Sequence, residues 1–98
     1  MSGLFDPKFF KALSDPNRIA ILIHLASCCE AHTVSRLAEC CPVDISVVSR
    51  HLAILREAGI LDAEKRGKEV YYSVRFPELE KTLRSIADAI RACCPKKD

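Results

Sequence analysis

The sequence predicts a mainly α-helical fold with one small β-hairpin. Apolar residues recur every three or four positions over most of residues 6–58 and again after Pro77, which is the spacing of amphipathic helices. Between these parts, residues 69–75 alternate apolar and polar side chains, as a half-buried strand does. The 98 residues contain no linker, repeat or low-complexity run, so we expect one domain over residues 1–98.

The composition indicates a globular protein without a strong overall charge. The hydrophobic fraction of 49% is sufficient to form a core, and the net charge of only +2 means that any basic surface must be local. No basic-then-apolar signal region precedes the first helix. The longest apolar stretch, Ile19–Leu25, is too short to cross a bilayer. We therefore expect a cytoplasmic protein that has no membrane partner.

Three helices are expected before residue 42. The first covers Asp6–Leu13. Asp15 is a good N-cap and Pro16 suits the first position of a second helix, which is apolar nearly all round and ends around Ser27–Cys29. Thr33 can cap a third helix, which Pro42 ends after Cys41.

A fourth helix follows after a short turn, so the third and fourth helices form a helix-turn-helix pattern. Asp44 or Ser46 caps this helix, which runs to about Ala58 and stops at Gly59. One face is an expected core stripe of Ile45, Val48, Leu52 and Leu55. The opposite face carries Ser46, Ser49, Arg50 and Ala53, whose small size and polar groups suit close approach to a DNA major groove.

A basic hairpin follows the fourth helix. Its expected strands, 60–65 and 69–75, flank a turn formed by Lys65-Arg66-Gly67-Lys68. A basic hairpin beside a recognition helix is a wing, placed to contact the phosphate backbone or minor groove, so the fold is a winged helix-turn-helix. The candidate DNA-binding residues are Ser46, Val47, Ser49, Arg50, His51, Lys65, Arg66 and Lys68.

The three histidines can each be explained without a metal-binding role. His51 on the fourth helix is either a structural side chain or a phosphate donor. We expect His24 to be a partly buried residue of the second helix and His32 to lie in a loop.

The last helix begins at Pro77 and carries a narrow apolar stripe. Its apolar positions, spaced 4-3-4-3, suit packing against one partner helix and so indicate a dimer. They are Leu79, Leu83, Ile86, Ile90 and Cys93.

The stretches "FKALSDPNRIAILIHL", "ISVVSRHLAILREAGIL" and "RGKEVYYSV" resemble the ArsR/SmtB family of winged-helix repressors. The resemblance implies a homodimer through the first and last helices that binds double-stranded operator DNA and leaves it when an effector binds. It implies a regulator and not an enzyme. A thiol oxidoreductase or metal carrier is the remote alternative, but the chain has no Cys-x-x-Cys motif and no acid–base constellation near its cysteines.

Six cysteines occur as three adjacent pairs, which are Cys28-Cys29, Cys40-Cys41 and Cys93-Cys94. Without a secretion signal we expect free thiols and not a disulfide framework. Thiolates select soft ions such as trivalent arsenic, cadmium, mercury, lead or copper(I), and zinc when four ligands are available. All six are therefore candidate metal ligands.

The resemblance does not name the effector, because the site varies within the family. Zinc-sensing members use Asp, His and Glu on the last helix, which here has no histidine. Arsenite- and cadmium-sensing members carry a Cys-x-Cys motif, whose places here are Thr33 and Ser35. Some arsenic-responsive relatives have a cysteine pair near the C-terminus, and persulfide-sensing relatives use the second and last helices.

These relatives imply that Cys93-Cys94 completes a soft-ligand site with Cys28-Cys29. The effector that this site favours is trivalent arsenic, as arsenite or an organoarsenical. Cys40-Cys41 stays a candidate because a ligand there lies directly before the recognition helix. The alternatives are a persulfide- or redox-sensing repressor and a repressor that senses cadmium, mercury, lead or copper.

Overall fold

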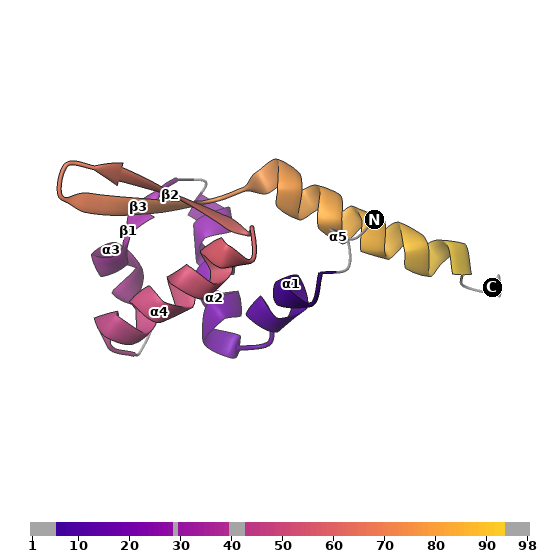
Figure 1. The fold of residues 1–98 in the computed structure, drawn as a ribbon, viewed down its shortest axis with the longest axis horizontal. Helices are drawn as coiled ribbons and strands as arrows, with labels where there is room; N and C mark the ends of the chain where they lie inside the picture. Colours follow the sequence, from indigo (N-terminus) through magenta and orange to yellow (C-terminus); the bar gives the residue numbers. More distant parts are fainter. Residues whose placement is uncertain (1–5, 29, 40–42, 94–98) are drawn as a thin grey trace.

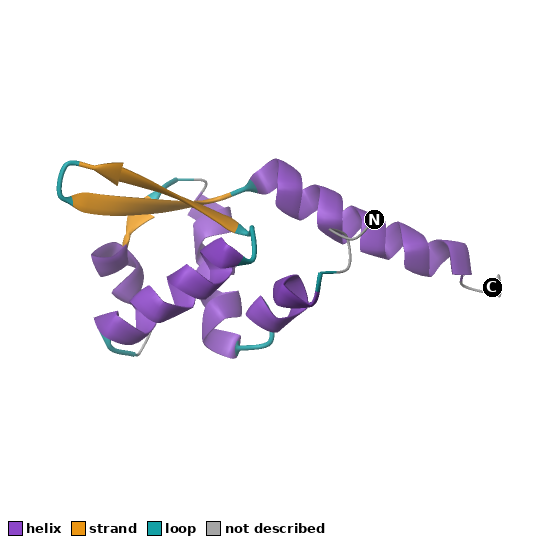
Figure 2. Ribbon diagram, viewed as in Figure 1, coloured by secondary structure: helices purple, strands orange, loops and turns teal. Residues whose placement is uncertain are grey.

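A computed structural model of the chain describes residues 6–28, 30–39 and 43–93 (Figure 1). The elements in chain order are α1 (Pro7–Ala12), α2 (Pro16–Cys28), β1 (His32–Thr33), α3 (Val34–Ala38), α4 (Ile45–Glu57), β2 (Leu61–Arg66), β3 (Glu69–Val74) and α5 (Phe76–Cys93). The expected fold class is confirmed, since helices dominate and the strands form one small antiparallel sheet (Figure 2).

Side chains cap two of the helices where the sequence predicts them. Oδ1 of Asp15 accepts hydrogen bonds from the backbone N–H groups of Asn17, at 2.7 Å, and Arg18, at 3.3 Å. Oγ1 of Thr33 accepts one from the N–H of Arg36 at 3.3 Å. Each bond satisfies a donor that has no partner inside the helix, so these residues fix where α2 and α3 begin.

The core lies between α2, α4 and the sheet. Val48, Leu52 and Leu55 of α4 are fully buried, as the predicted stripe requires. Ile45, the first residue of α4, is instead 51% exposed, so the stripe is buried only from Val48 onward. The buried apolar residues are Phe9, Ala12, Ile21, Leu25, Leu37, Val48, Leu52, Leu55, Ile60, Leu61 and Val74.

The sheet has three strands in the order β1-β3-β2, all antiparallel. Arg66 pairs with Glu69, so the turn contains only Gly67 and Lys68. The prediction of a four-residue turn was wrong, because the strand continues through residue 66. Gly67 has a φ of +64°, a left-handed conformation that glycine adopts without a steric penalty and that two-residue hairpin turns require.

β1 was not predicted, and it corrects the expectation that His32 lies in a loop. His32 pairs with Tyr72 and Thr33 with Tyr71. A strand of two residues is too short to show an alternating pattern, and its pairing depends on β3, which is distant in the sequence.

The other helix bounds agree with the prediction to within about one residue, except at the end of α3. α1 lies within one residue of its expected bounds, and Gly59, with a φ of +81°, follows the end of α4. α3 ends at Ala38 instead of Cys41, and residues 40–42 lie outside the described ranges. α5 begins one residue before Pro77.

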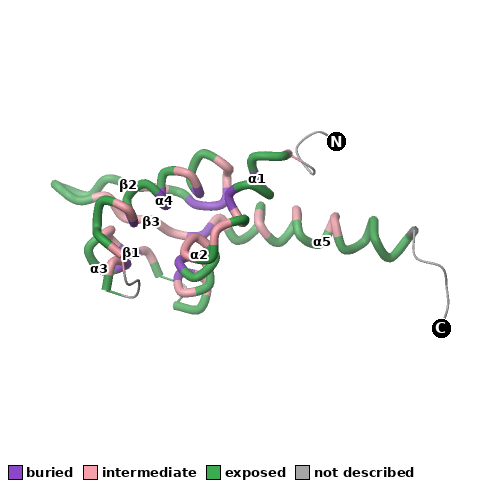
Figure 3. The backbone as a smooth tube through the Cα atoms, turned by 90° about the horizontal axis from the view of Figure 1, so that it is seen from below, coloured by how far each residue is buried: buried purple, intermediate pink, exposed green. Residues whose placement is uncertain are grey.

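α5 extends away from the rest of the molecule (Figures 1 and 3). Leu79 and Ile86 pack against the core, whereas Leu83 and Ile90 are 47% and 66% exposed. The predicted stripe is therefore divided between the protein's own core and its surface. Among the described residues, no helix has the length and apolar character needed to cross a membrane.

Candidate nucleic-acid interface

α4 presents an exposed face opposite its buried stripe. Ser46, Ser49, Arg50 and Ala53 are all exposed, and Val47 is half-buried beside them. At the start of the helix, the carbonyl oxygen of residue 44 accepts hydrogen bonds from the N–H groups of Val47 and Val48, at 3.0 Å each. Asp44, one of the predicted caps, makes no side-chain capping hydrogen bond, so the exposed face belongs to a helix that is held mainly by its buried side.

His51 does not lie on this exposed face. It is only 8% exposed, and its Nδ1 lies 3.2 Å from Nη1 of Arg18. The same guanidinium donates hydrogen bonds to the carbonyl oxygens of Ala12, at 2.7 Å, and Lys11, at 3.2 Å. His51 thus helps to connect α4 with the ends of α1 and α2, which matches the structural alternative for this residue.

The hairpin between β2 and β3 carries exposed cations near its turn. Arg66 lies over the ring of Tyr71, 4.6 Å from its centre, and its Nη2 is 3.1 Å from Oε1 of Glu64. Both contacts orient the guanidinium, although so exposed an ion pair adds little stability. Lys65 and Lys68 are exposed and form no ion pair with any described residue.

The hairpin and the start of α4 lie at the same end of the molecule (Figure 1). The C-terminal end of α5 lies at the opposite end. The structure therefore places the wing and the start of α4 at the same end of the molecule, while His51 is buried.

Only part of the cysteine prediction falls on described residues. Cys28 is an exposed free cysteine at the end of α2, and Cys93 is the last residue of α5. Cys29, Cys40, Cys41 and Cys94 lie outside the described residues. Within one chain, the end of α5 is far from β1 and the adjoining end of α2 (Figures 1 and 3).

One cluster was missed by the sequence analysis. His24 and Cys28 of α2 lie close to His32 of β1, and all three face a common pocket. The i, i+4 spacing of His24 and Cys28 is a signal that sequence reasoning could have used, because such residues share one helix face. The approach of His32 depends on β1 and had no local signal.

The comparisons with known proteins agree with this geometry. Residues 13–64 match a family described as "Helix-turn-helix domain". The chain is 33% identical to the arsenical resistance operon repressor of Escherichia coli K12, over 99% of this chain and 81% of that protein. It is 37% identical to the cadmium resistance transcriptional regulatory protein CadC of Lactococcus lactis, over 68% of this chain and 56% of that protein.

A solved structure supports the fold. An ArsR-like transcriptional regulator from Rhodococcus sp. RHA1 has a TM-score of 0.75 and 32% identity, over 90% of this chain and 79% of that one. Fold and site together define a winged helix-turn-helix protein. The chain belongs to the ArsR/SmtB family of transcriptional repressors, which are DNA-binding regulators and not enzymes.

Proposed function

We propose that this chain, as a single cytoplasmic domain, represses transcription as a homodimer that releases its operator when thiolates bind a soft effector. The DNA-binding part is supported by the position of the wing and the start of α4 at one end of the molecule, together with the exposed polar residues of α4. In this proposal α4 enters the major groove and the wing follows the phosphate backbone. The contacts come from Ser46, Val47, Ser49, Arg50, Lys65, Arg66 and Lys68.

The roles of these residues follow from their chemistry. Ser46 and Ser49 are small, so the helix backbone can approach the bases closely. Arg50 has a planar guanidinium that can pair with guanine through two hydrogen bonds. Lys65 and Lys68 carry point charges suited to phosphate, which position the protein without reading sequence.

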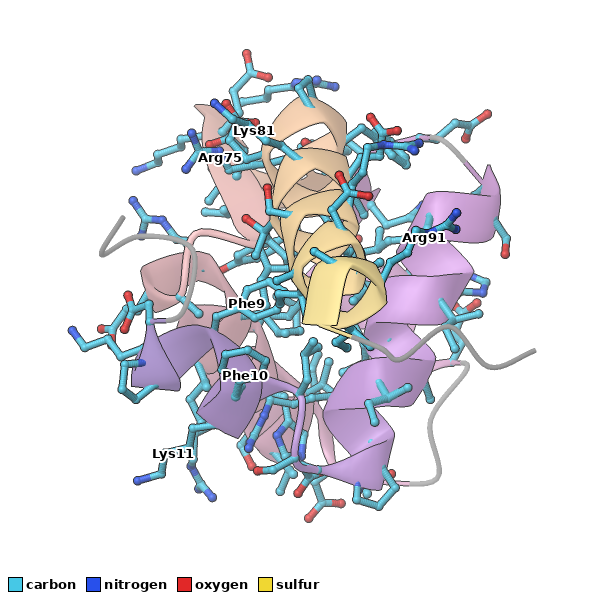
Figure 4. The ribbon with its side chains drawn as sticks, turned by 90° about the vertical axis from the view of Figure 1, so that its right-hand side faces the viewer. Phe9, Phe10, Lys11, Arg75, Lys81 and Arg91 are labelled. Atoms are coloured by element: carbon cyan, nitrogen blue, oxygen red, sulfur yellow. The ribbon has the colours of Figure 1, made fainter. Side chains whose placement is uncertain are left out.

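The homodimer is supported by exposed apolar side chains on three helices. Phe10 of α1, Ile19 and Ile23 of α2, and Leu83 and Ile90 of α5 are all exposed. Figure 4 looks along α5, with Phe10 and α1 on one side and α2 on the other. Because these helices lie around α5, a second copy could cover their apolar side chains together.

The effector that we propose is trivalent arsenic bound by cysteine thiolates. The arsenical resistance repressor of E. coli, matched over nearly all of this chain, supports this choice. Because the ends of α2 and α5 lie apart in one chain, a site that joins Cys28 to Cys93 and Cys94 requires the second copy. An effector that favours the DNA-free dimer by 1–3 kcal/mol would weaken operator binding about 5- to 150-fold.

The test is the fluorescence anisotropy of the reduced protein on its own promoter DNA, titrated with arsenite. We expect tight binding and then release at near-stoichiometric arsenite. The variant Cys93→Ser/Cys94→Ser should bind the same DNA and stay bound when arsenite is added.

Two outcomes would contradict the proposal. If arsenite leaves the wild-type complex intact, arsenic is not the effector, and a parallel titration with cadmium tests the ion named by the CadC relative. If the serine variant is still released, the C-terminal cysteine pair is not part of the site.

A further inference from the structure

A second group of potential ligands lies where α2 ends and β1 begins. One ligand atom from each of His24, Cys28 and His32 lies within 4.8 Å of the other two. The Sγ atom of Cys28 is 3.8 Å from Nε2 of His24, and the two imidazole rings lie 5.6 Å apart with an interplanar angle of 32°. Two nitrogens and one sulfur therefore converge on one small volume.

These separations fit a bound transition-metal ion. Two ligand atoms placed about 2.0–2.3 Å from one tetrahedral Zn²⁺ ion lie roughly 3.3–3.8 Å apart. The distance of 3.8 Å between Cys28 and His24 is within that range. Closing the widest separation, 4.8 Å, requires a movement of only about 1 Å, which side-chain rotation can supply.

His32 gives an independent sign of a missing ligand. Its side chain is only 7% exposed, and its Nε2 has no hydrogen-bond partner among the described residues. A buried polar atom without a partner costs free energy. A metal ion bound through Nε2 removes this cost, because the lone pair of the buried nitrogen then has a partner.

The surroundings leave room for an ion and a further ligand. The three residues line a pocket of about 530 Å³ together with Glu30, Arg36 and Glu39. Either carboxylate, or a water molecule, would complete a four-coordinate site. Arg36 contributes a positive charge to the lining, but the two glutamates outnumber it, so the pocket can accept a cation.

We propose that His24, Cys28 and His32 bind a borderline divalent transition metal, with Zn²⁺ as the representative ion. Two imidazoles and one thiolate are the mixed donors that zinc and its neighbours accept, whereas trivalent arsenic favours thiolates. On binding, the Cys28 thiol loses its proton and the thiolate donates an electron pair to the ion. This site does not rest on the proposed arsenite response, although Cys28 is common to both.

The position of the site explains what such an ion would stabilise. His32 begins β1, which pairs with β3 of the wing, and Thr33 caps α3 of the helix-turn-helix. A metal ion would therefore join the end of α2 to a segment that pairs with the wing and leads into α3. We expect Zn²⁺ to raise the melting temperature of the wild-type protein.

The test uses Co²⁺ as a spectroscopic probe for Zn²⁺ on the full, reduced chain. We expect one Co²⁺ per chain, with the intense visible bands of tetrahedral cobalt and a thiolate-to-cobalt charge-transfer band, both removed by Zn²⁺. His24→Gln, His32→Gln and Cys28→Ser should each weaken cobalt binding by at least about tenfold. Circular dichroism without metal checks that each variant is folded. If His32→Gln does not fold, His24→Gln decides the test, because His24 lies at a half-buried position of a helix.

The comparison variant Cys93→Ser/Cys94→Ser separates this proposal from the arsenite proposal. It should keep the cobalt spectrum of the wild type while losing arsenite-driven release. The variants His24→Gln and His32→Gln should lose the cobalt spectrum and keep arsenite-driven release. The metal site is overturned if the wild type binds neither ion, if folded His24→Gln binds cobalt as the wild type does, or if the serine variant loses the spectrum.

Discussion

At the residue scale, the charged carboxylate of Asp15 caps the start of α2. The backbone N–H of Asn17 donates a hydrogen bond to the carboxylate of Asp15. This bond is the main cause that lowers the pKa of Asp15 below its ordinary value of 3.8. Because the pKa is lowered on folding, the charged carboxylate stabilises the fold above that ordinary value. This contribution is lost as the pH falls through the lower folded-state pKa.

Replacing this cap should therefore have a pH-dependent effect. Asp15→Ala should lower the melting temperature at neutral pH, and the difference from wild type should shrink as the pH falls below 3.8 and through the lowered pKa of Asp15. Asp15→Asn keeps a capping oxygen without the charge, so it should lose less stability at neutral pH. Thermal unfolding followed by circular dichroism measures both, and an equal gap for Asp15→Ala at all pH values would contradict this role.

Single residues were predictable where their role is local. Asp15 and Thr33 were assigned as caps because a cap bonds to backbone groups two or three residues away. His32 was expected in a loop and lies instead in β1, whereas His51, expected to be structural or a phosphate donor, is buried. Elements distant in the sequence determine both positions. Burial of this kind depends on tertiary packing and leaves no local pattern.

At the element scale, α4 contains two apolar residues that the sequence predicts to be buried, but only one of them is buried in the structure. Leu52 is fully buried, whereas Ile45 is half-exposed. Leu52→Ala should destabilise the protein by about 2–5 kcal/mol, because it removes buried apolar surface and leaves a cavity. Ile45→Ala, the matched control, should cost clearly less.

Urea denaturation of both variants provides the measurement. The free energies of unfolding should differ between the two variants, with Leu52→Ala much the less stable. Equal losses would show that the first turn of α4 is covered in the native protein, contrary to the exposure of Ile45.

The elements themselves were largely predictable. Helix periodicity, the glycines at positions 59 and 67, and the alternation in β3 gave every helix and the hairpin, since these are local signals. The early end of α3 at Ala38 and the strand β1 were not predictable in the same way. β1 depends on its pairing with β3, which is distant in the sequence.

At the scale of the whole molecule, the exposed apolar residues of α5 support assembly. Leu83→Glu/Ile90→Glu should convert a dimer into monomers, because it places charges on surface that a second copy would cover. The monomer should bind the operator more weakly, since only one recognition helix is then present per particle. The control Lys81→Ala/Asp88→Ala changes exposed charges of the same helix and should stay dimeric.

Size-exclusion chromatography with light scattering gives the oligomeric state directly. A wild-type protein that is monomeric, or a glutamate variant that remains dimeric, would show that α5 does not form the interface. The sequence predicted the stripe on α5 from its spacing. Its division into a core-facing part and an exposed part became clear only when the path of the helix relative to the body was known.

The central claim is that the wing and α4 together bind DNA, and the salt dependence of operator binding tests it most directly. Each phosphate contact contributes about 0.9 to the slope of log affinity against log salt concentration. Because the dimer presents both lysines twice, Lys65→Ala/Lys68→Ala should weaken binding and reduce this slope by about 3.6, while Lys81→Ala on α5 should leave both unchanged. If the double variant binds with the affinity and slope of the wild type, the wing is not on the DNA and the account is wrong.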